Sequence, residues 1–178
     1  MTTGGSSAEG RRERWSRRLR TIPAMVVGFV LTTALLPLLL AGLGLYDAGR
    51  ALAGRGRFAA VRLLAFGWFY MLVELSGLSA MFGFWLVSGF GRRRSLYVSL
   101  TYRLQGWWAA SLLGAIRFLF HLGLEVDGDE VVVPGPIILM MRHASLADTV
   151  LPSVLVLRQH GIRLRYVLKR ELLWDPAL

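Results

Sequence analysis

The chain has 178 residues, of which 54% are hydrophobic, and its formal net charge is +10 at pH 7. It contains no cysteine, which excludes a disulfide framework and a thiolate zinc site. Its basic residues are almost all arginine, with Lys169 the only lysine, and they flank two long apolar runs. That arrangement favours anionic lipid headgroups as partners over nucleic acid.

Residues 1–20 are predicted to form a disordered basic tail. The first ten are rich in Gly, Ser and Thr, a composition typical of disorder, and residues 11–20 contain six arginines. Because an apolar run begins directly afterwards, the basic segment is typical of an anchor at a membrane surface. A solvated tail is the alternative.

The first apolar run, residues 22–46, contains no charged residue and exceeds the about 20 helical residues needed to cross a bilayer. Pro23 suits a helix start, and Pro37 is expected to kink the run or break it into halves. The run is longer than the roughly 7–15 apolar residues of a secretory signal, and no small-residue cleavage site follows. We therefore expect a retained anchor.

A second apolar run, residues 63–90, is interrupted only by Glu74 and ends in a cluster of three arginines at residues 92–94. Residues 21–94 are thus predicted to form a membrane-embedded helical hairpin, which either spans the bilayer twice or enters and leaves one leaflet. Both topologies put the following residues on the cytoplasmic side. Glu74 is expected to face a polar contact or to be protonated, since a charge in an apolar span is costly.

The remainder, residues 95–178, is predicted to begin as a helix and to continue as an α/β domain. Apolar residues recur near helical spacing over residues 95–122, which predicts a helix lying against the membrane or the domain core. The later patterns predict strands at 124–126, 130–133, 137–141 and 164–168, with a tight turn at Asp127-Gly128-Asp129 and an apolar helix over 152–159 that ends at Gly161.

The candidate site follows the apolar run 137–141, where His143 stands five positions before Asp148. A histidine oriented by a carboxylate is the usual equipment of a general base. The same residues also suit a packed histidine at a strand end and an aspartate that caps the next helix. The spacing alone does not decide between these two interpretations.

Residues 136–148, Pro-Ile-Ile-Leu-Met-Met-Arg-His-Ala-Ser-Leu-Ala-Asp, resemble the first motif of the glycerolipid acyltransferases, the family that includes 1-acylglycerol-3-phosphate acyltransferase. Upstream, Val126-Asp127-Gly128 stands where members have a short strand and a Gly turn. Downstream, residues 166–172 (Tyr-Val-Leu-Lys-Arg-Glu-Leu) are similar to the Lys-x-Glu-Leu stretch of many members. The resemblance covers roughly residues 100–178.

The resemblance implies an O-acyltransferase of phospholipid synthesis that moves an acyl chain from acyl-CoA or acyl carrier protein to a hydroxyl of a lysophospholipid or glycerol phosphate. His143 is then the general base and Asp148 its orienting carboxylate. Backbone N–H groups near Ser145 are candidates for stabilising the oxyanion. Arg142 and Lys169 are candidates for substrate phosphate, with a solvated surface charge as the alternative for each. The reaction needs no metal and no cofactor beyond the acyl donor.

Two departures from the family pattern bear on these expectations. Many members have Asn before the histidine, where this chain has Arg142, so the acceptor lipid stays open. The later Arg-bearing and Glu-Gly-Thr-Arg motifs do not occur, so we expect residues 95–178 to be an incomplete acyltransferase domain. The alternative function is a non-catalytic membrane-anchored fragment or interaction protein.

Overall fold

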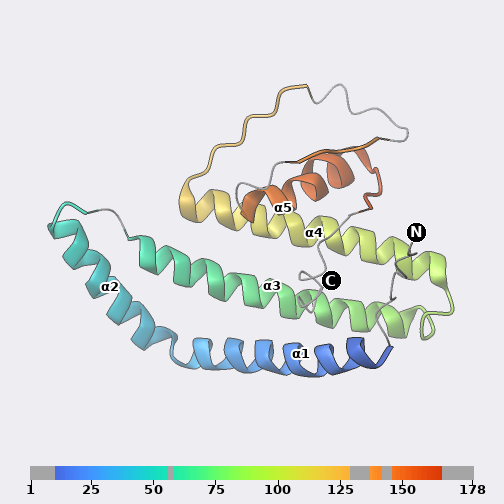
Figure 1. The fold of residues 1–178 in the computed structure, drawn as a ribbon, viewed down its shortest axis with the longest axis horizontal. Helices are drawn as coiled ribbons and strands as arrows, with labels where there is room; N and C mark the ends of the chain where they lie inside the picture. The colour runs from blue at the N-terminus through green and yellow to red at the C-terminus, as the bar shows by residue number, and fades with distance from the viewer. Residues whose placement is uncertain (1–10, 56–57, 129–136, 142–145, 166–178) are drawn as a thin grey trace, which may run out of the picture.

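The computed structural model describes residues 11–55, 58–128, 137–141 and 146–165. The helices are α1 (Arg11–Ala34), α2 (Leu36–Leu52), α3 (Ala59–Val87), α4 (Arg94–Phe120) and α5 (Leu146–Pro152), and the π-helix η2 (Ser153–Arg158) directly continues α5. Figure 1 shows α1, α3 and α4 as successive layers, with α5 against the face of α4 that points away from α3.

The break between α1 and α2 confirms the expectation for Pro37. This proline occupies the first turn of α2, and the two helices are bent by 68° at the break. Proline has no backbone N–H and its ring clashes with the carbonyl one turn earlier, so it suits a helix start and destabilises or kinks a helix interior. Pro23 was expected at a helix start, but α1 begins at Arg11 and Pro23 lies inside it.

Helix α1 runs antiparallel to α3 and packs against it through small and aromatic residues. Phe29 stacks on Trp68 with ring centroids 5.7 Å apart, and the indole Nε1 of Trp68 donates to Thr33 Oγ1 at 2.9 Å. The Gly28 position faces Met71, whose Sδ lies 3.8 Å from where a Cβ would stand. Gly28 therefore lies at the contact between α1 and α3.

The N-terminus of α3 is capped by a residue from the preceding helix. Asp47 of α2 is only 2% exposed, and its carboxylate accepts from the backbone N–H of Ala60 at 3.3 Å and of Val61 at 3.0 Å. Phe58, the residue at the N-cap position, makes no side-chain cap and has a left-handed backbone with φ of 34°. Asp47 therefore satisfies amides that have no partner inside α3, and it ties the α2–α3 corner together.

The turn between α3 and α4 reverses the chain sharply at the end of the second apolar run (Figure 1). Gly89, Phe90 and Gly91 all have positive φ, at 67°, 57° and 81°. The buried Ser88 stabilises the turn, because its Oγ donates to the carbonyl of Trp85 at 3.0 Å and accepts from the N–H of Gly91 at 3.2 Å.

Helix α4 confirms the helix predicted over 95–122 and lies at the centre of the core. The buried cluster comprises Val73 of α3, Ala109, Leu112 and Leu113 of α4, and Val150 of α5. Next to it, Trp108 Nε1 donates to Glu74 Oε1 at 2.9 Å, and the Glu74 side chain is fully buried. The expectation that Glu74 faces a polar contact is confirmed.

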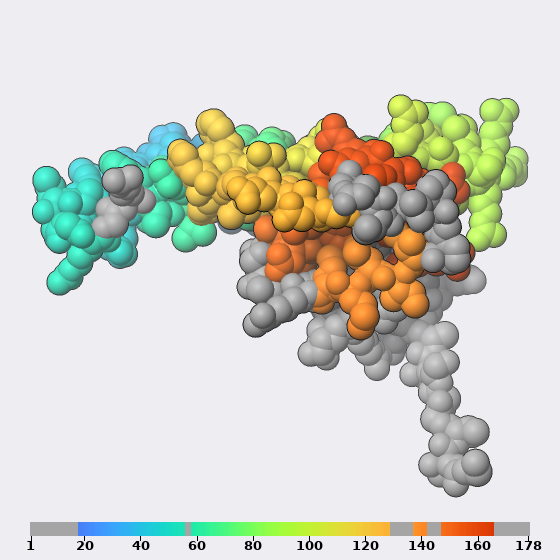
Figure 2. Space-filling view, turned by 90° about the horizontal axis from the view of Figure 1, so that it is seen from above, coloured from blue at the N-terminus to red at the C-terminus, as the bar shows by residue number. Residues whose placement is uncertain are grey.

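The predicted α/β architecture is wrong for the part of the chain that the structure describes, which is all-α and contains no strand. Residues 137–141, expected to be a buried strand, form no regular element, and Ile138 and Met140 are about nine-tenths exposed (92% and 90%). This segment lies at the surface in Figure 2. Residues 124–126 and 164–165 are not strands either, while 130–133 and 166–168 lie outside the described residues.

The physical reason is that an apolar run does not specify which segment will pair with its backbone. A strand must pair its backbone N–H and C=O groups with another strand, and the described residues supply none. Short apolar runs are also ambiguous between strand and other buried segments when read by periodicity. The helices carry their hydrogen bonds internally and therefore do not depend on such a neighbour.

Helix α3 is long and apolar enough to cross a membrane. It has 29 residues, which corresponds to about 43 Å of helix against a bilayer core of about 30 Å. The bent pair of residues 18–34 and 36–52 passes the same test if it counts as one span. Core helices of soluble proteins also pass, but they are mostly buried, whereas only 17% of the apolar window of α3 is buried.

Candidate functional site

Of the five predicted site residues, the structure describes only Asp148. His143, its expected partner, and the other three candidates Arg142, Ser145 and Lys169 lie outside the described residues. The structure therefore gives the surroundings of Asp148 and does not give the geometry of the His143–Asp148 pair.

Asp148 is half-buried in the first turn of α5. Two residues further on, Val150 is 2% exposed and packs against Ala109, Leu112 and Leu113 of α4. This packing fixes the start of α5 on the helical layer. A carboxylate in the first turn also interacts favourably with the positive end of the helix dipole. As the third residue of α5, Asp148 is not its N-cap residue, and the orienting role is compatible with its place in the first turn.

The described residues also form a groove that sequence reasoning did not single out, between α4 and the end of η2. It has a volume of about 400 Å³ and is lined by Ser99, Tyr102, Arg103, Gly106, Trp107, Leu157, Arg158, Gly161 and Arg163. The five residues from α4 follow the spacing i, i+3, i+4, i+7, i+8 and so form one face of a helix. This spacing of polar and aromatic residues is the sequence pattern that could have indicated the α4 side of the groove.

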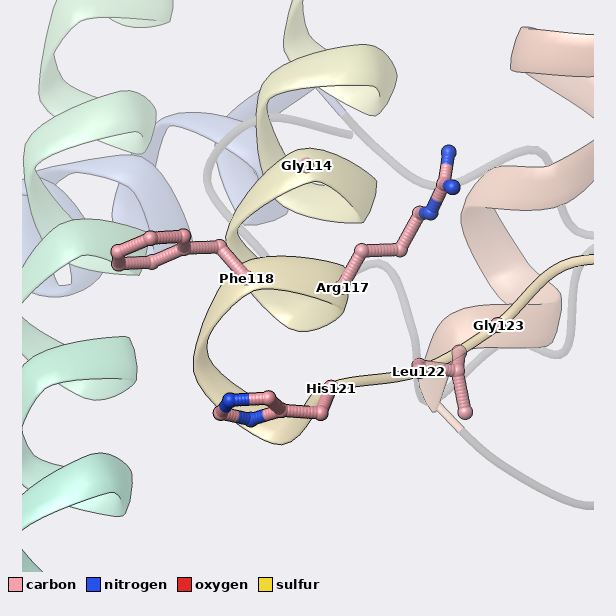
Figure 3. Close-up of a pocket in the computed structure, with 6 residues that line it drawn as sticks. All are labelled: Gly114, Arg117, Phe118, His121, Leu122 and Gly123. Atoms are coloured by element: carbon pink, nitrogen blue, oxygen red, sulfur yellow. The ribbon is translucent and has the colours of Figure 1, made fainter.

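A second hollow, of about 550 Å³, lies at the C-terminal end of α4 and is shown in Figure 3. Arg117, Phe118 and His121 leave the helix in different directions there, so their functional groups do not converge on one point. His121 is exposed and has a left-handed backbone with φ of 56° at the helix end. It is a solvated residue.

No group of three or more His, Asp or Glu side chains within the described residues is placed to hold a metal ion. Comparison of the chain with known protein families, with curated proteins and with solved structures finds no match.

Proposed function

We propose that the protein is a membrane-bound O-acyltransferase in which His143 acts as general base and Asp148 orients it. The observation that carries the proposal is the order of residues in the sequence. An apolar run leads into Arg142, His143 and Ser145, Asp148 follows, and a Lys-Arg-Glu-Leu stretch begins at Lys169. The half-buried position of Asp148 at the anchored start of α5 supports it.

In the proposed reaction, His143 takes the proton from a hydroxyl of a lysophospholipid or glycerol phosphate as that oxygen attacks the thioester carbonyl of acyl-CoA or an acyl carrier protein. Asp148 accepts a hydrogen bond from the other imidazole nitrogen and stabilises the imidazolium. When the tetrahedral intermediate collapses, the C–S bond breaks and the thiolate takes the proton back from His143. Backbone N–H groups near Ser145 stabilise the oxyanion, and Arg142 and Lys169 contact substrate phosphate.

The proposed location is a membrane, with the residues after α4 on the cytoplasmic side. Large apolar side chains are exposed along the outer faces of α1 and α2, including Val26, Val27, Val30, Leu31, Leu38 and Leu45. The antiparallel packing of α1 on α3 brings Arg18 and Arg20 toward the same end of the bundle as the arginines 92–94. A basic end of this kind is expected on the cytoplasmic side.

The test is acyl transfer by membranes that contain the full chain, with labelled acyl-CoA or acyl carrier protein and each acceptor in turn. We expect His143→Ala to lower the turnover by roughly 10²–10⁴-fold, the usual contribution of a general base. Asp148→Asn should lower it too, while membrane association stays unchanged. His121→Asn is the matched control, because asparagine tolerates the left-handed backbone at that exposed position. Equal turnover of the wild type and His143→Ala contradicts the mechanism.

The second candidate is a non-catalytic membrane protein that serves in anchoring or interaction. The specific observation in its favour is that residues 137–141, which lead into the motif, form no strand, and that four of the five, residues 138–141, are exposed. This candidate predicts no transfer from any acyl donor and no loss of cellular function in His143→Ala or Asp148→Asn.

A further inference from the structure

The groove between α4 and η2 carries three arginines on a small surface. Arg103 comes from α4, Arg158 ends the π-helix η2, and Arg163 lies just beyond the turn at Gly161. All three are exposed, and none of the nine described lining residues is acidic. No ion pair joins any of the three guanidinium groups to a carboxylate within the described part of the chain.

The local backbone is built to bring these charges together. Gly106 of α4 is buried where η2 packs on α4, and a Cβ added there would stand 3.8 Å from Arg158 Cβ, an ordinary contact distance. On the other side, the guanidinium of Arg163 lies over the ring of Tyr102, 5.3 Å from its centroid. This cation–π contact orients Arg163 at the groove. The π-helical turn that ends at Arg158 is a geometry that frequently occurs at functional sites.

We propose that this groove binds a phosphate group of a small phosphate ester or of a lipid headgroup. A guanidinium group can bind a phosphate through two parallel hydrogen bonds. Three guanidinium groups around one groove suit a phosphate better than a carboxylate, because a carboxylate carries only one negative charge. Ser99 and Tyr102 add hydroxyl groups to the same wall. The volume of about 400 Å³ lies within the range of small-ligand pockets.

The groove is separate from Asp148, the member of the predicted catalytic pair that the structure describes. Val150 packs near Leu112 and Arg158 packs near Gly106, so α5 and η2 run antiparallel to α4. Asp148 and Arg158 stand ten residues apart along this helical segment, which is roughly 15 Å. The proposal therefore does not rest on the acyltransferase function and can be tested without any turnover.

The experiment measures binding to the purified full chain in neutral detergent, with three probes. They are inorganic phosphate, glycerol phosphate, and a short-chain phosphatidic acid compared with the diacylglycerol of the same chain length. The proposal expects the phosphate-bearing probes to bind and the diacylglycerol not to bind. If glycerol phosphate binds as tightly as phosphatidic acid, the ligand can be a soluble phosphate ester. If only phosphatidic acid binds, the ligand is a lipid headgroup.

Variants then locate the site. Arg103→Gln, Arg158→Gln and Arg163→Gln should each weaken the phosphate-bearing probe about tenfold, as expected for one lost charge-assisted contact. Arg117→Gln on the same helix lies outside the groove and should bind as the wild type does. Far-UV circular dichroism checks that each variant keeps its helices.

A steric pair tests the same groove without changing its charge. Gly106→Ala puts a methyl group in ordinary contact with Arg158 and should keep binding, while Gly106→Leu should fill the groove and abolish it. The proposal is overturned if the wild type binds none of the phosphate probes. It is equally overturned if the three groove variants bind as tightly as Arg117→Gln.

Discussion

The carboxylate of Asp47 is the contact whose removal should have the clearest effect on stability. It accepts from the backbone amides of Ala60 and Val61 across the α2–α3 corner, at 3.3 and 3.0 Å, and is 2% exposed. Asp47→Ala leaves both part-buried amides without this acceptor. An N-cap replacement costs about 0.5–2 kcal/mol and an unsatisfied buried donor about 1–3 kcal/mol. We therefore expect a loss of about 2–4 kcal/mol in the free energy of unfolding.

Asp47→Asn separates the two hydrogen bonds, because the amide side chain keeps only one oxygen as acceptor. Its expected loss is about half that of Asp47→Ala. The measurement is the unfolding of the full chain in detergent micelles, followed by far-UV circular dichroism. Asp127→Ala, at an exposed position, is the control and should change the free energy by less than about 0.5 kcal/mol. If Asp47→Ala unfolds with the free energy of this control, the capping interaction does not stabilise the fold.

Three further substitutions follow from the α3–α4 layer, each measured by the same unfolding assay. Trp108→Phe removes the donor to the buried Glu74 and should cost about 1.5–3 kcal/mol, whereas Trp107→Phe, at a residue that is 48% exposed, should cost far less. Similar losses for the two tryptophans contradict a role for the Glu74 contact. Gly114→Ala should stabilise by about 0.5–1 kcal/mol, because the glycine lies inside α4 and an added Cβ meets nothing within 4 Å. Gly91→Ala should destabilise by about 1–2 kcal/mol, because its φ is +81°; a neutral result there refutes the strained turn.

The proposed membrane location gives the buried Glu74 a structural meaning. A carboxyl group on an apolar helix is costly in lipid unless it has a polar partner. Trp108 supplies one across the α3–α4 interface, 34 residues away in sequence. The contact thus orients α4 on α3 while keeping the carboxyl group away from the outer face of α3.

The sequence by itself determined the local elements of this protein. Helical spacing located α4, the apolar run located α3 within a few residues, and Pro37 marked the break between α1 and α2. These features depend on residues three or four positions apart, or on the missing N–H of one proline, so they are present in the sequence pattern. The arginines 92–94 likewise marked the end of the second run.

Tertiary structure alone decided what these elements contact. Asp47 and Val61 are 14 residues apart, and Glu74 and Trp108 are 34 apart, so no local pattern pairs them. The three arginines of the groove come from α4, η2 and the segment after Gly161, and only the packing of η2 on α4 brings them together. The strand predicted at 137–141 failed for the same reason: a strand exists only if another segment pairs with it, and apolar residues do not say which one.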